Sequence, residues 1–141
     1  MAKKYENLEH LADLKIRAYG KNKEEVFANM ALGMFANIVD QEKLITNEPV
    51  REEIKVMSND LEALLVDFLN RLVYLGDVND EAYNFFDLAI FEKDKKWILE
   101  GVAKGFKVGG LKTEIKAVTY NELKLGEGQD GNWIAEVVFD I

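Results

Sequence analysis

The segment 59–75 constrains the fold of this chain more than any other part of the sequence. Its apolar residues recur at intervals of three and four, which is the spacing of one face of an α-helix. Asn59 at its start and Glu62 three residues later predict a capping box, and Gly76 predicts the end of the helix. A face this wide must be covered by other elements. Its apolar residues are Leu61, Leu64, Leu65, Phe68, Leu69, Leu72 and Val73.

The first half of the chain supplies a second helix and two strands. Asn22 and Glu25 repeat the capping pattern, and an apolar stripe follows over residues 26–39. Apolar and polar residues alternate over 14–20 and again over 50–57, which predicts a half-buried strand before each helix. These patterns predict two strand–helix pairs packed side by side.

The second half of the chain shows strand patterns only. From residue 84 onward, two hairpins are expected, one turning at 93–96 and the other at the glycine-rich loop 126–131. The element order β-α-β-α-β-β-β-β predicts an α+β fold, with two helices packed on one face of a largely antiparallel sheet. No linker interrupts the pattern, so residues 1–141 are expected to form a single domain.

Composition narrows the classes of function. The chain has 18 basic and 26 acidic residues and a net charge of −8, so its surface should repel a phosphate backbone. Tight direct binding of nucleic acid is therefore not expected, and a protein partner with a basic surface is. The absence of cysteine excludes disulfides and thiolate metal sites. No apolar run resembles a membrane span or a signal peptide, which predicts a cytoplasmic protein.

Strand alternation brings two charged residues together in the last hairpin. If the apolar faces of its two strands coincide, paired residues must be both even-numbered or both odd-numbered. A tight loop then places Asp140 opposite Lys116 or Val118. A lysine at such a position lies about 5 to 8 Å away, within reach of the carboxylate. The simplest interpretation is a surface ion pair, which would contribute less than about 1 kcal/mol.

The end of the last strand also gathers negative charge. The α-carboxylate of Ile141 follows Asp140, so two anionic groups lie side by side. Oxygen ligands without thiolates or paired histidines suit Ca²⁺ or Mg²⁺ better than Zn²⁺. A third carboxylate could come from Asp13, Asp40 or Asp77, and sequence spacing does not choose among them.

Catalytic motifs are weak. His10 is the only histidine, and no serine motif accompanies it, so a nucleophilic triad has little support. A lone histidine is more often a surface or packing residue. A small metal-dependent hydrolase is therefore the poorest interpretation of this sequence.

Four segments resemble a known family. Residues 5–13 (YENLEHLAD), 14–20 (LKIRAYG), 114–120 (EIKAVTY) and 138–141 (VFDI) are similar to the corresponding parts of the archease family. The element order and the length also match, so the resemblance covers the whole chain. Two departures stand out: Leu11 replaces a usual threonine, and Asn121 replaces a histidine that many relatives carry.

The resemblance implies a function and a site. Archeases are accessory proteins, not enzymes, of the RtcB-type tRNA-splicing RNA ligase. That ligase joins 2′,3′-cyclic phosphate or 3′-phosphate RNA ends to 5′-hydroxyl ends through a guanylylated histidine of its own. Archease promotes guanylylation and multiple turnover. The resemblance assigns metal binding to Asp13, Asp140 and the Ile141 carboxylate, with Ca²⁺ expected first and Mg²⁺ or Mn²⁺ as alternatives. It assigns ligase activation to Asp13, Asp140 and Lys116.

Two further residues and one other function stay open. His10 and Asp40 are additional candidates for the site. The main alternative is a chaperone-like binding module that serves nucleic-acid-modifying enzymes in general. Broad partner binding without dependence on the ligase would favour that alternative.

Overall fold

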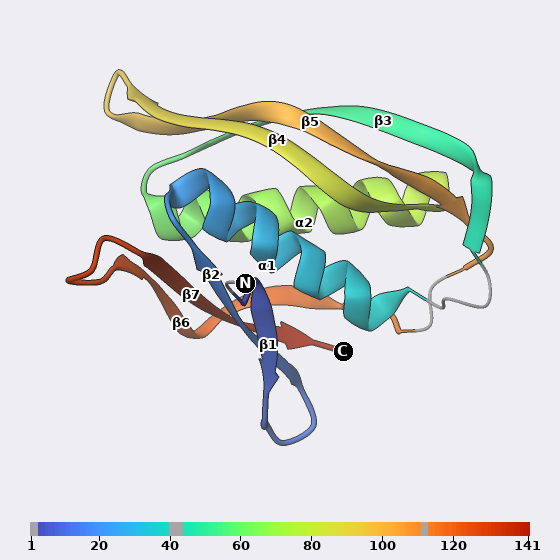
Figure 1. Cartoon of the computed structure of the whole chain (residues 1–141), viewed down its shortest axis with the longest axis horizontal. Coiled ribbons are helices and arrows are strands. Elements are labelled where there is room, and N and C mark those ends of the chain that lie inside the picture. The colour runs from blue at the N-terminus through green and yellow to red at the C-terminus, as the bar shows by residue number, and fades with distance from the viewer. Residues whose placement is uncertain (1–2, 40–43, 111–112) are drawn as a thin grey trace.

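The computed structural model describes residues 3–39, 44–110 and 113–141 and arranges them in three layers (Figure 1). The helices α1 (Lys23–Ile38) and α2 (Leu61–Asn79) form the middle layer, and a sheet covers each side of it. The strands are β1 (Tyr5–Leu8), β2 (Leu14–Gly20), β3 (Leu44–Ser58), β4 (Glu81–Lys93), β5 (Lys96–Val108), β6 (Ala117–Glu127) and β7 (Trp133–Asp140).

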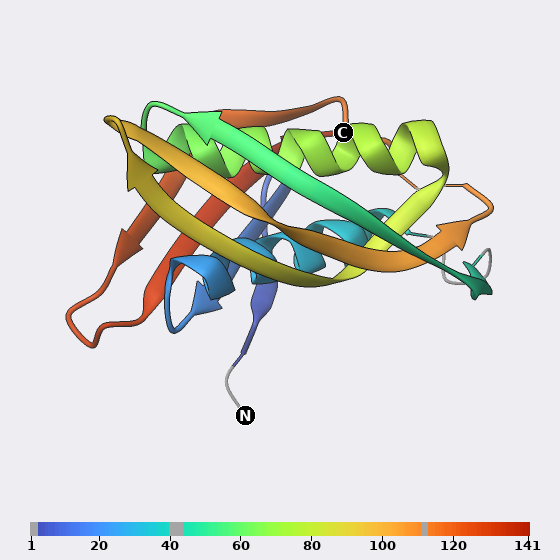
Figure 2. The same cartoon turned by 90° about the horizontal axis from the view of Figure 1, so that it is seen from above.

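The strands form two antiparallel sheets. The first, which we call the terminal sheet, has the order β1-β2-β7-β6 and so combines the first strands of the chain with the last. The second, the long sheet, has the order β3-β5-β4. Figure 2 shows the strands of the long sheet lying across the helices. No helix in the described part of the chain is long and apolar enough to cross a membrane.

The α+β class and the largely antiparallel pairing are confirmed, with two differences in detail. The strand β1 was not expected, and the single sheet on one face of the helices is in fact two sheets on opposite faces. The reason is visible on α1, which is apolar on opposite sides. Gly33 packs against Tyr5 and Ile16 of the terminal sheet, and Phe35 stacks edge-on against Tyr83 of the long sheet, at 5.4 Å between ring centroids.

The core lies between the helices and the sheets. Phe68 of α2 is fully buried and packs against Phe27 of α1 and Phe86 of β4, with ring centroids 6.0 and 6.2 Å apart. Pairs of this kind add roughly 0.5–1.5 kcal/mol each beyond the area they bury. The aromatic cluster therefore ties both helices to the long sheet.

Helix α1 begins as predicted. The Asn22 side chain accepts the backbone N–H of Glu25 at 2.8 Å. The Glu25 carboxylate in turn accepts the backbone N–H of Lys21 at 3.3 Å, one residue before the position that a capping box requires. Both bonds satisfy donors that would otherwise lack partners near the start of the helix.

Both predicted ends of α2 were wrong. Its cap is Asp60, which accepts the backbone N–H of Ala63 at 2.7 Å, whereas Asn59 accepts a hydrogen bond from Lys96. The helix also continues through Gly76 to a left-handed residue at position 80. Gly76 has a packing role instead, because a Cβ there would lie only 2.7 Å from a backbone carbonyl oxygen of β4.

Both predicted hairpins are present. Asp94 and Lys95 have φ values of 53° and 64°, the left-handed conformation of a two-residue type I′ turn between β4 and β5. The glycine-rich loop connects β6 to β7.

The pairing of β6 with β7 departs from the predicted alternation. Its register shifts between Thr119 and Lys124, and Glu122 within that stretch has φ 55°. This irregularity changes which residues face inward, so Val118 is buried in the core, opposite Phe139. The expectation that residue numbers of equal parity pair holds next to the loop and fails at the other end of the strands.

Candidate functional site

The pairing of β2 with β7 brings the two ends of the chain together. Leu14 lies opposite Phe139, and the two strands run antiparallel. The ladder ends at that pair, with Asp13 one residue before Leu14 and Asp140 one residue after Phe139. Asp13 and Asp140 therefore lie at the same end of the terminal sheet.

Lys116 also lies next to Asp140. Its backbone N–H donates to the Asp140 carbonyl oxygen at 2.7 Å, and its side chain is exposed. The residue directly opposite Asp140 is Ala117, so the prediction that Lys116 or Val118 would stand there was wrong. The cause is the register shift in β6, which displaces the pairing by an odd number of residues. We call Asp13, Lys116, Asp140 and the Ile141 carboxylate the terminal site.

The other aspartates considered as ligands lie elsewhere or are not described. Asp77 lines a polar hollow at the C-terminal end of α2, together with Asp80 and Glu114. Asp40 lies outside the described residues. Within the described ranges, no three or more His, Cys, Asp or Glu residues are placed so that they could hold a metal ion. The predicted ligands are the side chains of Asp13 and Asp140 and the main-chain carboxylate of Ile141, so the set contains only two acidic side chains.

A network of charged side chains borders the terminal site on the outer face of the sheet. His10 Nε2 lies 2.7 Å from an oxygen of Glu122, whose other oxygen lies 3.5 Å from Lys15 Nζ. Lys15 Nζ is also 3.6 Å from Glu136, and Arg17 contacts Glu136 through Nε and Nη2, both at 2.9 Å. We call these five residues the outer cluster.

The outer cluster is held together by a buried carboxylate. The side chain of Glu136 is only 7% exposed, so it depends on Arg17 and Lys15 for neutralisation. At the edge of the cluster, the hydrogen bond with His10 and the charge of Lys15 lower the pKa of the Glu122 carboxyl. Glu122 therefore bridges His10 and Lys15 at the edge of the cluster.

His10 connects the outer cluster to the terminal site. Its Nδ1 is buried, has no hydrogen-bond partner among the described residues, and lies 3.7 Å from a carboxylate oxygen of Asp13. The ring thus presents a polar atom toward Asp13 while Glu122 fixes its opposite edge. Of the cluster, the sequence analysis singled out only His10. Opposite charges at alternating positions of β2 and β7 were the available signal, because Arg17 pairs directly with Glu136.

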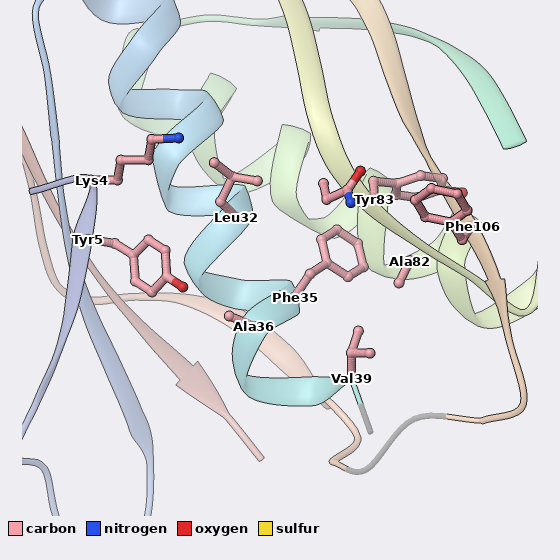
Figure 3. Close-up of a pocket in the computed structure, with 10 residues that line it drawn as sticks. Lys4, Tyr5, Leu32, Phe35, Ala36, Val39, Ala82, Tyr83 and Phe106 are labelled. Carbon is pink, nitrogen blue, oxygen red and sulfur yellow. The ribbon is translucent and has the colours of Figure 1, made fainter. Parts of the chain in front are cut away.

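An apolar cavity of about 380 Å³ lies apart from these polar groups (Figure 3). It opens between β1, helix α1 and the strands β4 and β5. Tyr5 and Lys4 lie on one side of the helix, and Tyr83 and Phe106 lie on the other. Its lining is mostly apolar and combines no nucleophile with a general base, so it offers space without reactive chemistry.

Comparison with known proteins agrees with this architecture. The model of the archease protein family matches residues 5–141. The protein archease of Methanosarcina mazei is 46% identical over 144 residues, covering 99% of this chain and 97% of the relative. The protein archease of Pyrococcus furiosus is 40% identical over 143 residues, covering 99% of each chain.

Two solved structures share the fold. The solution structure of protein 1598 from Methanobacterium thermoautotrophicum has a TM-score of 0.76 at 33% identity, covering 97% of this chain and 98% of that one. The crystal structure from Thermotoga maritima, described as an archease and possible chaperone, has a TM-score of 0.54 at 26% identity. It covers all of this chain and 98% of that one. The family model and these whole-length relatives agree, and the chain belongs to the archease family.

Proposed function

We propose that this chain is a non-catalytic activator of an RtcB-type RNA ligase in the cytoplasm. It promotes guanylylation of the ligase and lets it turn over repeatedly in tRNA splicing and RNA repair. One observation supports the proposal: the β2–β7 ladder ends next to both Asp13 and Asp140, and the Lys116 N–H donates to the main-chain carbonyl oxygen of Asp140. Two acids and a lysine from separate parts of the chain thus belong to the same end of the terminal sheet.

The donor set fits a hard divalent cation in its chemistry. Asp13, Asp140 and the Ile141 carboxylate would hold Ca²⁺, with Mg²⁺ or Mn²⁺ as alternatives, because all of their donor atoms are oxygens. Ca²⁺ takes six to eight oxygen ligands, so this set alone would leave coordination positions open. When bound, the cation would supply positive charge for phosphate oxygens.

The charges of the chain support docking on a nucleotide-using protein. Net charge −8 favours a basic, RNA-binding surface as the partner. The exposed Lys116 ammonium would lie against the phosphates of GTP in the ligase and offset the charge that develops there. Asp13 and Asp140 would orient that contact.

A multiple-turnover ligation assay tests the proposal. The ligase is mixed with excess RNA carrying 3′-phosphate and 5′-hydroxyl ends, with GTP, and with this chain. Guanylylated ligase is measured in parallel from radiolabelled GTP. We expect Asp13→Ala, Lys116→Ala and Asp140→Ala each to lower both readings at least tenfold. Asp94→Asn and Lys93→Ala, which remove the same charges from the β4–β5 hairpin, should stimulate like the wild type.

Three outcomes separate the interpretations. Wild-type stimulation by all three site variants would refute the proposed role of the terminal site. Loss of stimulation together with loss of the thermal unfolding transition would assign the residues to folding only. Calorimetric titration with Ca²⁺ tests the metal separately, and Asp13→Asn and Asp140→Asn should each weaken binding.

A chaperone-like module is the second candidate, favoured by the description of the Thermotoga maritima relative as a possible chaperone. In that case the chain would suppress aggregation of several unrelated nucleic-acid-modifying enzymes. Light scattering during their heating measures this directly. Protection of many enzymes, with no effect on ligase guanylylation, would favour the second candidate over the first.

A further inference from the structure

Leu11 is an apolar side chain left almost entirely in water. It lies in the loop between β1 and β2 and is 92% exposed. The other large apolar side chains whose exposure the structure describes retain more cover; Val78 on α2, for example, is 59% exposed. In Figure 1 this loop projects away from the body of the molecule below the terminal sheet. Contact with another surface would remove nearly the whole side chain from water.

The loop holds Leu11 in a fixed position. On one side, His10 is largely buried and hydrogen-bonds to Glu122 across the sheet. On the other, Ala12 adopts a left-handed φ of 64°, and Asp13 leads directly into β2. A non-glycine residue persists in that conformation only when its surroundings impose it. Leu11 is thus presented by a preorganised loop, which lowers the entropy cost of binding.

Charge surrounds this apolar tip and is mainly negative. Glu9 is exposed beside it, Asp13 is two residues away, and Asp140 and Lys116 lie at the same end of the terminal sheet. The chain as a whole has a net charge of −8. A complementary surface would have an apolar socket for one leucine and a rim of lysines and arginines. A side chain contributes most to binding where a pocket desolvates it fully and the surrounding contacts exclude water.

We infer that Leu11, at a position where the family usually has threonine, is an apolar anchor particular to this chain by which it docks on its protein partner. The inference rests on the proposed function, in which that partner is the basic RNA ligase. Leu11 enters an apolar socket of the partner, and the acidic residues around it meet the basic rim. The anchor thereby aligns the terminal site with the ligase without taking part in metal binding or in charge stabilisation.

The test measures binding and activation separately. Affinity for purified ligase is measured by calorimetry with the wild-type chain and with Leu11→Ser, Leu11→Met and Val78→Ser. We expect Leu11→Ser to weaken binding by on the order of 10- to 100-fold, because serine cannot bury the apolar area that leucine removes from water on binding. Leu11→Met keeps an apolar side chain of similar volume and should bind within about threefold of the wild type. Val78→Ser, the control on α2, should bind like the wild type.

Saturation distinguishes the anchor from the terminal site. With enough Leu11→Ser to fill the ligase, guanylylation should return to the wild-type level, whereas Lys116→Ala should stay defective at any concentration. Raised salt should weaken binding of the wild type and of Leu11→Ser by similar factors, so the ratio of their two affinities should stay nearly unchanged. Equal affinity of Leu11→Ser and wild type, or equal loss with Val78→Ser, would overturn the anchor while leaving the proposed function intact. A wild-type chain that neither binds nor stimulates the ligase would overturn both.

Discussion

Glu136 offers the sharpest test of how the terminal sheet is held together. It is a carboxylate with a 7% exposed side chain, and two N–H groups of Arg17 donate to one of its oxygens at 2.9 Å. Lys15 Nζ lies 3.6 Å from the other oxygen. Glu136→Ala removes the only carboxylate that contacts both cations within the outer cluster. The variant should fold but lose stability.

The size of the loss follows from the burial of each partner. Removing one member of a fully buried ion pair costs roughly 3–5 kcal/mol, because the other charge stays unpaired in the interior. Arg17 is 35% exposed and can regain water, and Lys15 keeps Glu122 at 3.5 Å. We therefore expect Glu136→Ala to lower the free energy of unfolding by about 2–3 kcal/mol. At ~3 °C per kcal/mol, Tm should fall by roughly 6–9 °C. Glu136→Gln, which keeps an acceptor, should cost about 1–2 kcal/mol.

Urea unfolding at neutral pH, followed by circular dichroism, measures these changes. Glu53→Gln is the matched control, because it breaks an exposed pair with Arg51 and should cost less than about 0.5 kcal/mol. Arg17→Met combined with Glu136→Leu should recover most of the loss of either single variant, since an apolar pair replaces the ionic one. A Glu136→Ala chain as stable as the wild type would refute this account of the outer cluster.

Three further predictions follow from local contacts. Gly76→Ala should destabilise the chain by about 1–3 kcal/mol in thermal unfolding, because the Cβ of the new alanine would lie 2.7 Å from the Glu81 carbonyl oxygen. The strain from this contact outweighs the higher helix propensity of alanine, which is worth roughly 1 kcal/mol. Asp60→Ala should cost about 1 kcal/mol in urea unfolding, because the cap of α2 is lost. The Tyr19 hydroxyl donates to the Glu6 carboxylate at 2.5 Å and lowers the pKa of that carboxyl below its ordinary value of 4.5. The hydrogen bond therefore stabilises the folded chain above pH 4.5, and this stabilisation is lost as the pH falls through the folded-state pKa. Tyr19→Phe should thus be destabilised at neutral pH, and urea midpoints measured across the acid range should converge with those of the wild type.

Features that depend on a few adjacent residues could be predicted from the sequence. The cap at Asn22 and the turn at Asp94 and Lys95 each involve residues within four positions of one another. The shift in β6 could not be predicted, because its left-handed residue is Glu122 and not a glycine. Side-chain alternation identifies an apolar face only while the backbone stays regular, so it misplaced Val118.

For the candidate site, the sequence offered the chemistry of the residues but not their pairing. The carboxylates at Asp140 and Ile141 led to the prediction of a cation, which stays a prediction, and spacing alone could not select Asp13 from the other aspartates. That choice depends on the register between β2 and β7, which is set by contacts between opposite ends of the chain. The resemblance to a family supplied the choice, and the register is consistent with it.

The order of strands in the terminal sheet also determines when this protein can fold. Strand β7 lies between β2 and β6, yet it is the last of these strands to leave the ribosome. Until residues 133–140 are synthesised, β2 can pair only with the short β1, and one face of α1 has no complete cover. Closure of so long a loop is slow compared with hairpin formation. The long sheet can therefore form first, before the edge that carries Asp13 and Asp140 is assembled.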